Sequence, residues 1–140
     1  MKPLELRQPG AVLLLSCYEL GRQPLTLASA IAVLRDAGFR PAALDLSRQR
    51  LDEDAVRRAR VIALAVPMHT ALRIGVIAAE KVRALQPEAH VVFFGLYAAL
   101  NGDALLERGA QAVIGGECDE PLRRFLEDLD AGGAGAVPGV

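Results

Sequence analysis

Residues 11–21, Ala-Val-Leu-Leu-Leu-Ser-Cys-Tyr-Glu-Leu-Gly, decide the fold, because an aliphatic run stops there at a polar loop that contains glycine. An unbroken apolar run of this length is typical of a strand covered on both faces, as in a parallel sheet. A helical pattern follows, with apolar side chains at Leu27, Ile31 and Leu34. Gly38 stands in the C-cap position of that helix. The stretch therefore predicts a strand, a loop and a helix, and ligands of open parallel sheets bind at such loops.

The same unit recurs along the chain. Strands are expected at Ala11–Leu15, Pro41–Leu46, Val61–Val66, His90–Phe94 and Ala112–Ile114. Further helices are expected from about Asp52 to Arg58, from about Gly102 to Arg108, and from an N-cap at Asp119. Another helix is expected between the third and fourth strands, where the core face carries Ile74, Ile77, Ala78, Val82 and Leu85. Alternating strands and helices with right-handed crossovers predict a flavodoxin-like (Rossmann-like) three-layer α/β sandwich. Its five-stranded parallel sheet is expected in the order 2-1-3-4-5, with the switch point between the first and third strands.

Composition limits the kind of protein. The 140 residues are 52% hydrophobic with four Phe, two Tyr and no Trp, so the core is aliphatic. The net charge is -1, from 16 basic and 17 acidic residues, so the chain lacks the excess of positive charge that nucleic-acid-binding proteins carry. Neither a signal peptide nor an apolar run near the roughly 20 residues of a membrane span is evident, which favours a cytoplasmic protein.

Residues 1–130 are expected to form one α/β domain. The glycine-rich residues 131–140 read as a flexible linker that leads to a further, catalytic domain. Cys17 and Cys118 follow the first and fifth predicted strands, about 14 Å apart at roughly 4.8 Å per strand, so both thiols are expected to stay free.

Several segments carry a resemblance to a known family. They are Leu14-Leu15-Ser16, the helix over residues 25–38, Leu44-Asp45-Leu46, Gly95, residues 101–106 and residues 112–117. In order and spacing they resemble the N-terminal cobalamin-binding domain of radical SAM enzymes. The resemblance implies a domain that presents a corrin to a following catalytic domain. The iron-sulfur cluster and S-adenosylmethionine would belong to that following domain, because two distant cysteines cannot hold a cluster.

The resemblance also implies where a corrin would bind. The family's loop Asp-x-His-x-x-Gly corresponds here to Ser16, Tyr18 and Gly21. A phenol is a poor cobalt ligand beside neutral imidazole, so we expect cobalamin to bind without a histidine of this loop on cobalt. The cofactor-binding residues implied at the strand ends are Ser16, Tyr18, Gly21, Val66, Met68, His69, Gly95, Tyr97, Gly116 and Glu117. No catalytic residue and no protein ligand to a metal is expected.

Each of these residues also has a structural interpretation. Gly21 either admits a ligand or relaxes the turn, and Tyr18 either contacts a corrin or caps the edge of the sheet. His69 is either an axial ligand or proton carrier, or a solvated loop residue. Gly116 and Glu117 either approach a ligand or lead into the last helix.

Other functional classes lack their motifs. A flavin site needs a cradle of small residues in the first loop, where Glu19 would instead repel phosphate. A receiver domain needs an aspartate after the third strand, where the chain has Ala65-Val66-Pro67, and Gly-x-Gly-x-x-Gly is missing. The alternative that stays open is a non-catalytic interaction domain of the same fold that has lost the corrin.

Overall fold

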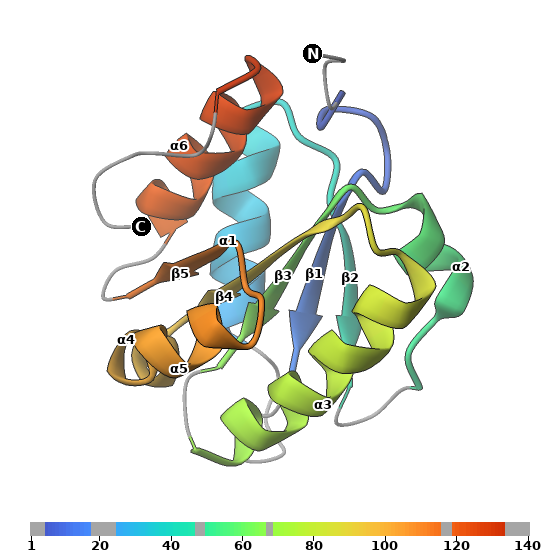
Figure 1. Cartoon of the computed structure of the whole chain (residues 1–140). Coiled ribbons are helices and arrows are strands. Elements are labelled where there is room, and N and C mark those ends of the chain that lie inside the picture. Colours follow the sequence, from blue (N-terminus) through green and yellow to red (C-terminus); the bar gives the residue numbers. More distant parts are fainter. Residues whose placement is uncertain (1–4, 18–24, 47–49, 67–68, 116–118, 134–140) are drawn as a thin grey trace.

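The computed structural model describes residues 5–17, 25–46, 50–66, 69–115 and 119–133, which form a parallel sheet between two layers of helices (Figure 1). The strands are β1 (Val12–Ser16), β2 (Ala42–Asp45), β3 (Val61–Ala65), β4 (His90–Phe94) and β5 (Ala112–Ile114). The helices are α1 (Leu25–Asp36), α2 (Glu53–Arg58), α3 (His69–Leu85), α4 (Leu96–Leu100), α5 (Gly102–Glu107) and α6 (Asp119–Asp130). The order β2-β1-β3-β4-β5 confirms the predicted topology.

Strand β1 lies between β2 and β3 and pairs in parallel with both. Leu14 stands opposite Ala43 on one side and Ala63 on the other. All five residues of β1 and all five of β3 are buried. This explains why these two segments are unbroken apolar runs, since neither face of the strands meets water.

The alternation of side chains along β1 divides the core into two halves. Val12 and Leu14 point to the face covered by α1 and α6, where they join Leu34 and Phe125. The other half lies under α2, α3 and the α4–α5 segment and consists of Leu13, Leu15 and their neighbours. Because the side-chain period of a strand is two, a slip of one residue in β1 would exchange the two halves.

Local sequence signals set the helix ends. The carboxylate of Asp52 accepts hydrogen bonds from the backbone N–H groups of Asp54 and Ala55 at 3.1 and 3.2 Å, which makes it the N-cap of α2. Gly38 has φ 92° after α1, and the N–H of Phe39 donates back to the carbonyl of Leu34 at 3.0 Å. A left-handed glycine followed by this bond is the usual way to end a helix.

Two predictions about the helices were wrong in part. Helix α4 was not predicted, because its five residues are too few to show a period. Ile77 was placed on the buried face of α3, but its side chain is 58% exposed. The helix instead packs on the sheet through small residues, among them Gly75, Ala78 and Ala79.

The N-terminal segment is clamped to the end of α6. The N–H of Leu6 donates to the carboxylate of Asp130 at 2.8 Å, and the guanidinium of Arg7 forms an ion pair with the same carboxylate. The guanidinium of Arg7 also lies over the ring of Phe39, 4.5 Å from its centroid. One carboxylate thus joins the two ends of the described fold.

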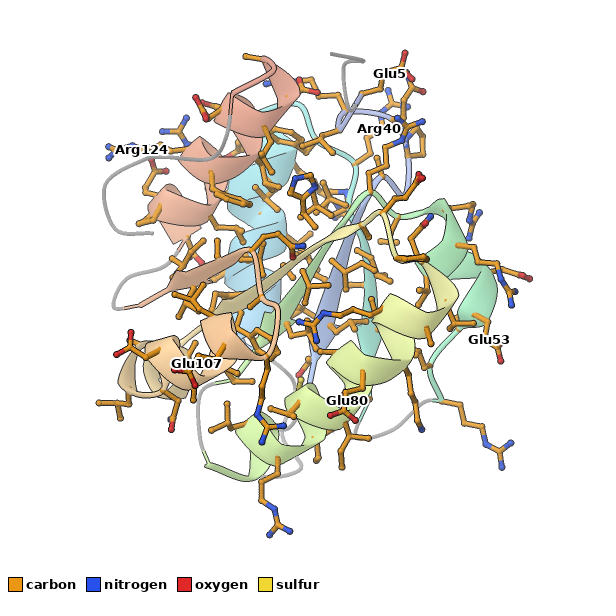
Figure 2. All side chains as sticks on the ribbon, viewed as in Figure 1. Glu5, Arg40, Glu53, Glu80, Glu107 and Arg124 are labelled. Carbon is orange, nitrogen blue, oxygen red and sulfur yellow. The ribbon has the colours of Figure 1, made fainter. Side chains whose placement is uncertain are left out.

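The labelled side chains of Glu5, Glu53, Glu107 and Arg124 lie at the periphery of the molecule (Figure 2). Of the helices that the structure describes, none has the length and the apolarity needed to cross a bilayer.

Replacement of Leu14 by alanine tests the role of β1. Leu14 is fully buried between two strands and two helices, so we expect Leu14→Ala to lower the free energy of unfolding by about 2–5 kcal/mol. Leu106→Ala is the matched control, because Leu106 is 48% exposed and its truncation is expected to change stability by under about 0.5 kcal/mol. Urea denaturation measures both, and equal losses would contradict the described packing.

Candidate functional site

The candidate site is the edge of the sheet at which the parallel strands end. Strands β1 and β3 lie side by side at the switch point, with Ser16 opposite Ala65. Backbone hydrogen bonds continue past the strands, from the N–H of Leu46 to the carbonyl of Ser16 and from the N–H of Val66 to the carbonyl of Phe94, both at 2.8 Å. The backbone at this edge is therefore held in place up to the points where the loops begin.

Ser16 is the end of β1 and lies on the side of α1 and α6. It is 2% exposed and is the one polar residue among the described segments that is fully buried. Its partner across the strands, Ala65, is small. Nearby, the hydroxyl of Ser29 in α1 donates to the carboxylate of Asp119 in α6, which holds the two helices together at this end of the sheet.

Cys17 lies on the opposite face and is chemically inert. Its thiol is free and fully buried. Burial raises its pKa to about 12, and the negative charge of Asp45 acts in the same direction. A thiol that holds its proton is neither a nucleophile nor a metal ligand at neutral pH.

Helix α3 closes the crevice above Cys17. A Cβ atom at Gly75 would lie 3.1 Å from Val66, 3.3 Å from the sulfur of Cys17 and 3.4 Å from the ring of Phe93. The first two distances are shorter than ordinary van der Waals contacts, so a side chain at this position would force Val66 or Cys17 to move or α3 to shift away from the sheet. Between β1, β3 and α3 the interior is filled by the protein's own side chains.

Two glycines at the ends of β4 and β5 make room for α4. Gly95 has φ 114° and ψ 176°, a conformation that side chains strongly disfavour, and it turns the chain from β4 into α4. A Cβ atom at Gly115 would collide with Ala99 of α4. Helix α4 therefore covers the ends of these two strands.

The structure places the predicted site residues in three groups. Ser16, Val66 and Gly95 lie at the same edge, as predicted. His69 and Tyr97 were predicted in loops but lie within α3 and α4, and only their backbone is described. The remaining five, Tyr18, Gly21, Met68, Gly116 and Glu117, lie outside the described residues, as does Cys118.

Sequence analysis missed Gly75 as a determinant of this site. A glycine inside a long helical pattern costs about 1 kcal/mol relative to alanine, so its position between Ile74 and Val76 signals a close packing contact. That signal was present but was not used.

The described part of the edge limits how a cobalamin would fit. Across the segments described, no three His, Cys, Asp or Glu side chains lie close enough to hold a metal ion. The crevice beneath α3 is filled by Cys17, Val66 and Phe93, and α1 and α6 are joined through Ser29 and Asp119 on the other face. These packed contacts leave no space beneath α3 for the nucleotide tail of a cobalamin.

No protein-family model and no curated protein matches this sequence. Among solved structures, a crystal structure described as that of a pilus assembly-related protein from Burkholderia pseudomallei is similar to this chain. It matches with a TM-score of 0.62 at 17% sequence identity, over 89% of this chain and 92% of the other. At this identity the similarity supports the α/β fold and carries no statement about function.

Replacement of Gly75 tests the closed crevice. In an ordinary helix Gly→Ala stabilises by about 1 kcal/mol. Here we expect Gly75→Ala to destabilise the protein by about 1 kcal/mol, because overpacking against three buried side chains outweighs that gain. The double variant Gly75→Ala/Val66→Ala is expected to lower the free energy of unfolding by less than the sum of the losses in the two single variants. Additive losses in urea denaturation would show that the crevice has spare room.

The buried thiol predicts a dependence of stability on pH. The unfolded chain releases the Cys17 proton near pH 9, whereas the folded chain holds it up to about pH 12. The stabilising contribution is therefore complete below pH 9 and is lost as the pH rises toward 12, at up to about 1.4 kcal/mol per pH unit. Urea denaturation between about pH 8 and 10.5 measures this slope. Cys17→Ala is the control, and parallel pH profiles for the two proteins would contradict the burial of the thiol.

Proposed function

We propose that this chain is a non-catalytic accessory domain that seats a cobalamin on the carboxyl edge of its sheet and presents it to a following radical SAM domain. The observation that carries the proposal is the position of the segments that resemble the cobalamin-binding family. The segments ending in Ser16, Gly95 and Gly115 all reach the same edge of the sheet, and Ser16 lies at the switch point between β1 and β3. Open α/β sheets bind their ligands at that place.

The proposed mode of binding uses backbone and small side chains. When bound, a corrin supplies a cobalt centre for group transfer. This chain would support one side of the corrin through the strand ends at Ser16, Val66 and Gly95 and would leave the other side to the following domain. Because α3 packs closely on Cys17 and Val66 at Gly75, the nucleotide tail would lie outside that part of the core.

A second candidate is the interaction domain that has kept the fold and lost the corrin. It is favoured by the filled crevice at Cys17, because a domain that no longer receives a cofactor has no need of a slot below the edge. The two candidates make opposite predictions for corrin binding.

Titration with two corrins tests the proposal. Hydroxocobalamin and cobinamide, which lacks the nucleotide tail, are each added to this chain and to a longer form that continues past Val140. We expect both to bind, with affinities within about tenfold of each other, because the tail contributes no buried contact. Electron paramagnetic resonance of the cobalt(II) form is expected to show no nitrogen splitting from a protein imidazole.

Variants locate the corrin. Tyr18→Ala is expected to weaken binding of both corrins, and Leu106→Ala on α5 is the matched control that should leave it unchanged. Strong preference for hydroxocobalamin over cobinamide, or nitrogen splitting that disappears in His69→Ala, would overturn the proposed mode. No binding of either corrin to either form would favour the interaction domain.

A further inference from the structure

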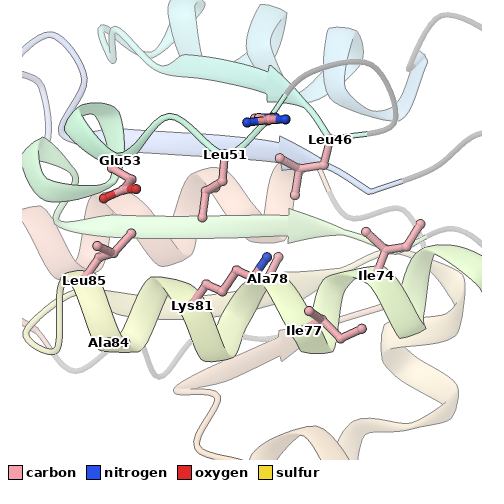
Figure 3. A pocket seen from close by; sticks show the side chains of 10 residues that line it. Leu46, Leu51, Glu53, Ile74, Ile77, Ala78, Lys81, Ala84 and Leu85 are labelled. Carbon is pink, nitrogen blue, oxygen red and sulfur yellow. The ribbon is translucent and has the colours of Figure 1, made fainter.

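A groove of about 670 Å³ runs along the outer side of the domain, from Leu46 and Ile74 near the carboxyl edge to Leu85 (Figure 3). One wall is formed by Leu46 and Leu51, which lie between β2 and α2. The other wall is α3, which contributes Ile74, Ile77 and Leu85. Both walls are therefore aliphatic, although the groove lies at the surface.

The exposure of Ile77 is the first observation that points to an interaction surface here. Its side chain is 58% exposed in the middle of α3, where the sequence pattern placed it in the core. The neighbouring Ile74 and Leu85 are only half-buried, so the apolar surface continues along the helix. Contiguous apolar surface lined by polar residues marks interaction sites more often than isolated exposed side chains do.

The charges around the groove are positive. Arg73 and Lys81 stand four residues before and after Ile77, which puts all three on one stripe of α3. Arg50 lies on the opposite wall, and Figure 3 shows Lys81 rising from α3 toward that wall. Within the described segments, Arg50, Arg73 and Lys81 have no ion-pair partner.

The acidic residues nearby are already engaged. Glu53 lines the groove but lies 3.2 Å from the guanidinium of Arg57. Glu80, beside Lys81 on α3, lies 3.9 Å from the guanidinium of Arg108. The groove therefore combines apolar walls with Arg50 and Lys81 on its two sides, and Glu53, the one carboxylate among its described lining residues, is paired with Arg57.

The shape of the groove indicates which kind of ligand it can bind. From Ile74 to Leu85 it follows α3 for twelve residues, a rise of about 16 Å at 1.5 Å per residue. Sites for small molecules enclose most of the ligand surface, whereas this groove is open along Ile77. An open apolar trough of this length matches two to three turns of a helix that places side chains at positions i, i+3 or i+4, and i+7.

Among the described elements, a second copy of this chain offers no such helix. The acidic helix α6 is the amphipathic candidate among the described elements, but its apolar residues Leu122, Phe125 and Leu126 are buried in its own core. We propose that the groove binds an acidic amphipathic helix of a partner protein. Its apolar side chains would contact Ile77 and Leu51, and its carboxylates would lie beside Arg50, Arg73 and Lys81.

Selection from a displayed peptide library tests this proposal. The library consists of helical peptides of about 12 residues, the length of the groove, with both the apolar and the charged positions randomised. We expect the enriched peptides to carry apolar residues at helical spacing and a net negative charge. Their affinity, measured by fluorescence anisotropy, should fall as salt is added, because the rim charges are exposed.

Matched variants of the whole chain locate the binding. Ile77→Glu is expected to lower the affinity for the selected peptide by about tenfold or more. It removes the central apolar contact and adds a negative charge that repels the acidic peptide. Lys81→Glu is expected to lower the affinity by about three- to tenfold and to reduce the salt dependence. Leu106→Glu and Arg124→Glu make the same changes on α5 and α6, and should leave affinity within about twofold. Circular dichroism verifies that every variant is folded.

Three results would overturn the proposal. The first is the absence of enrichment, or enrichment of neutral or basic peptides. The second is binding of dodecanoate in the groove without binding of any peptide, which would identify a small anionic amphiphile as the occupant. The third is self-association of the wild-type chain that Ile77→Glu abolishes, because the occupant would then be a second copy.

Discussion

Strand β1 is paired on both edges and covered on both faces, and the positions of all the other elements depend on that constraint. Its alternating side chains belong to two separate halves of the core, so its register sets which helices lie on which side. It also creates the switch point, because the chain leaves β1 toward β2 and returns on the other side at β3. The edge where Ser16 and Val66 end is thus a consequence of how β1 is buried.

Sequence reasoning succeeded where burial on both faces leaves a continuous apolar run. The limits of β4 and β5 agree with the predicted blocks, and Asp52 and Gly38 mark helix ends by local chemistry alone. It failed where packing between distant segments of the chain determines whether a helix forms or a side chain is buried. Helix α4 depends on Gly115 making room for it, and the exposure of Ile77 depends on small residues of α3 that bring the helix against the sheet.

The candidate site was predictable in its location more than in its chemistry. Parallel topology alone brings Ser16, Val66 and Gly95 to one edge. The state of the interior below them was not predictable, because the filling of that space by Cys17 and Phe93 depends on how closely α3 approaches. The result is two unlike surfaces on one small domain. The described edge consists of backbone, small side chains and the carboxylate of Asp45, whereas the groove beside α3 has apolar walls flanked by Arg50 and Lys81.

The clamp at Asp130 determines the route of any polypeptide that continues beyond it. Because Asp130 is bound to Leu6 and Arg7, α6 ends at the edge where the strands begin, opposite the candidate site. A segment that continued from Asp130 to the candidate site would have to return along the length of α6, about 18 Å for twelve residues. The fixed end of α6 therefore sets the side of the domain from which a covalently attached partner would approach the site.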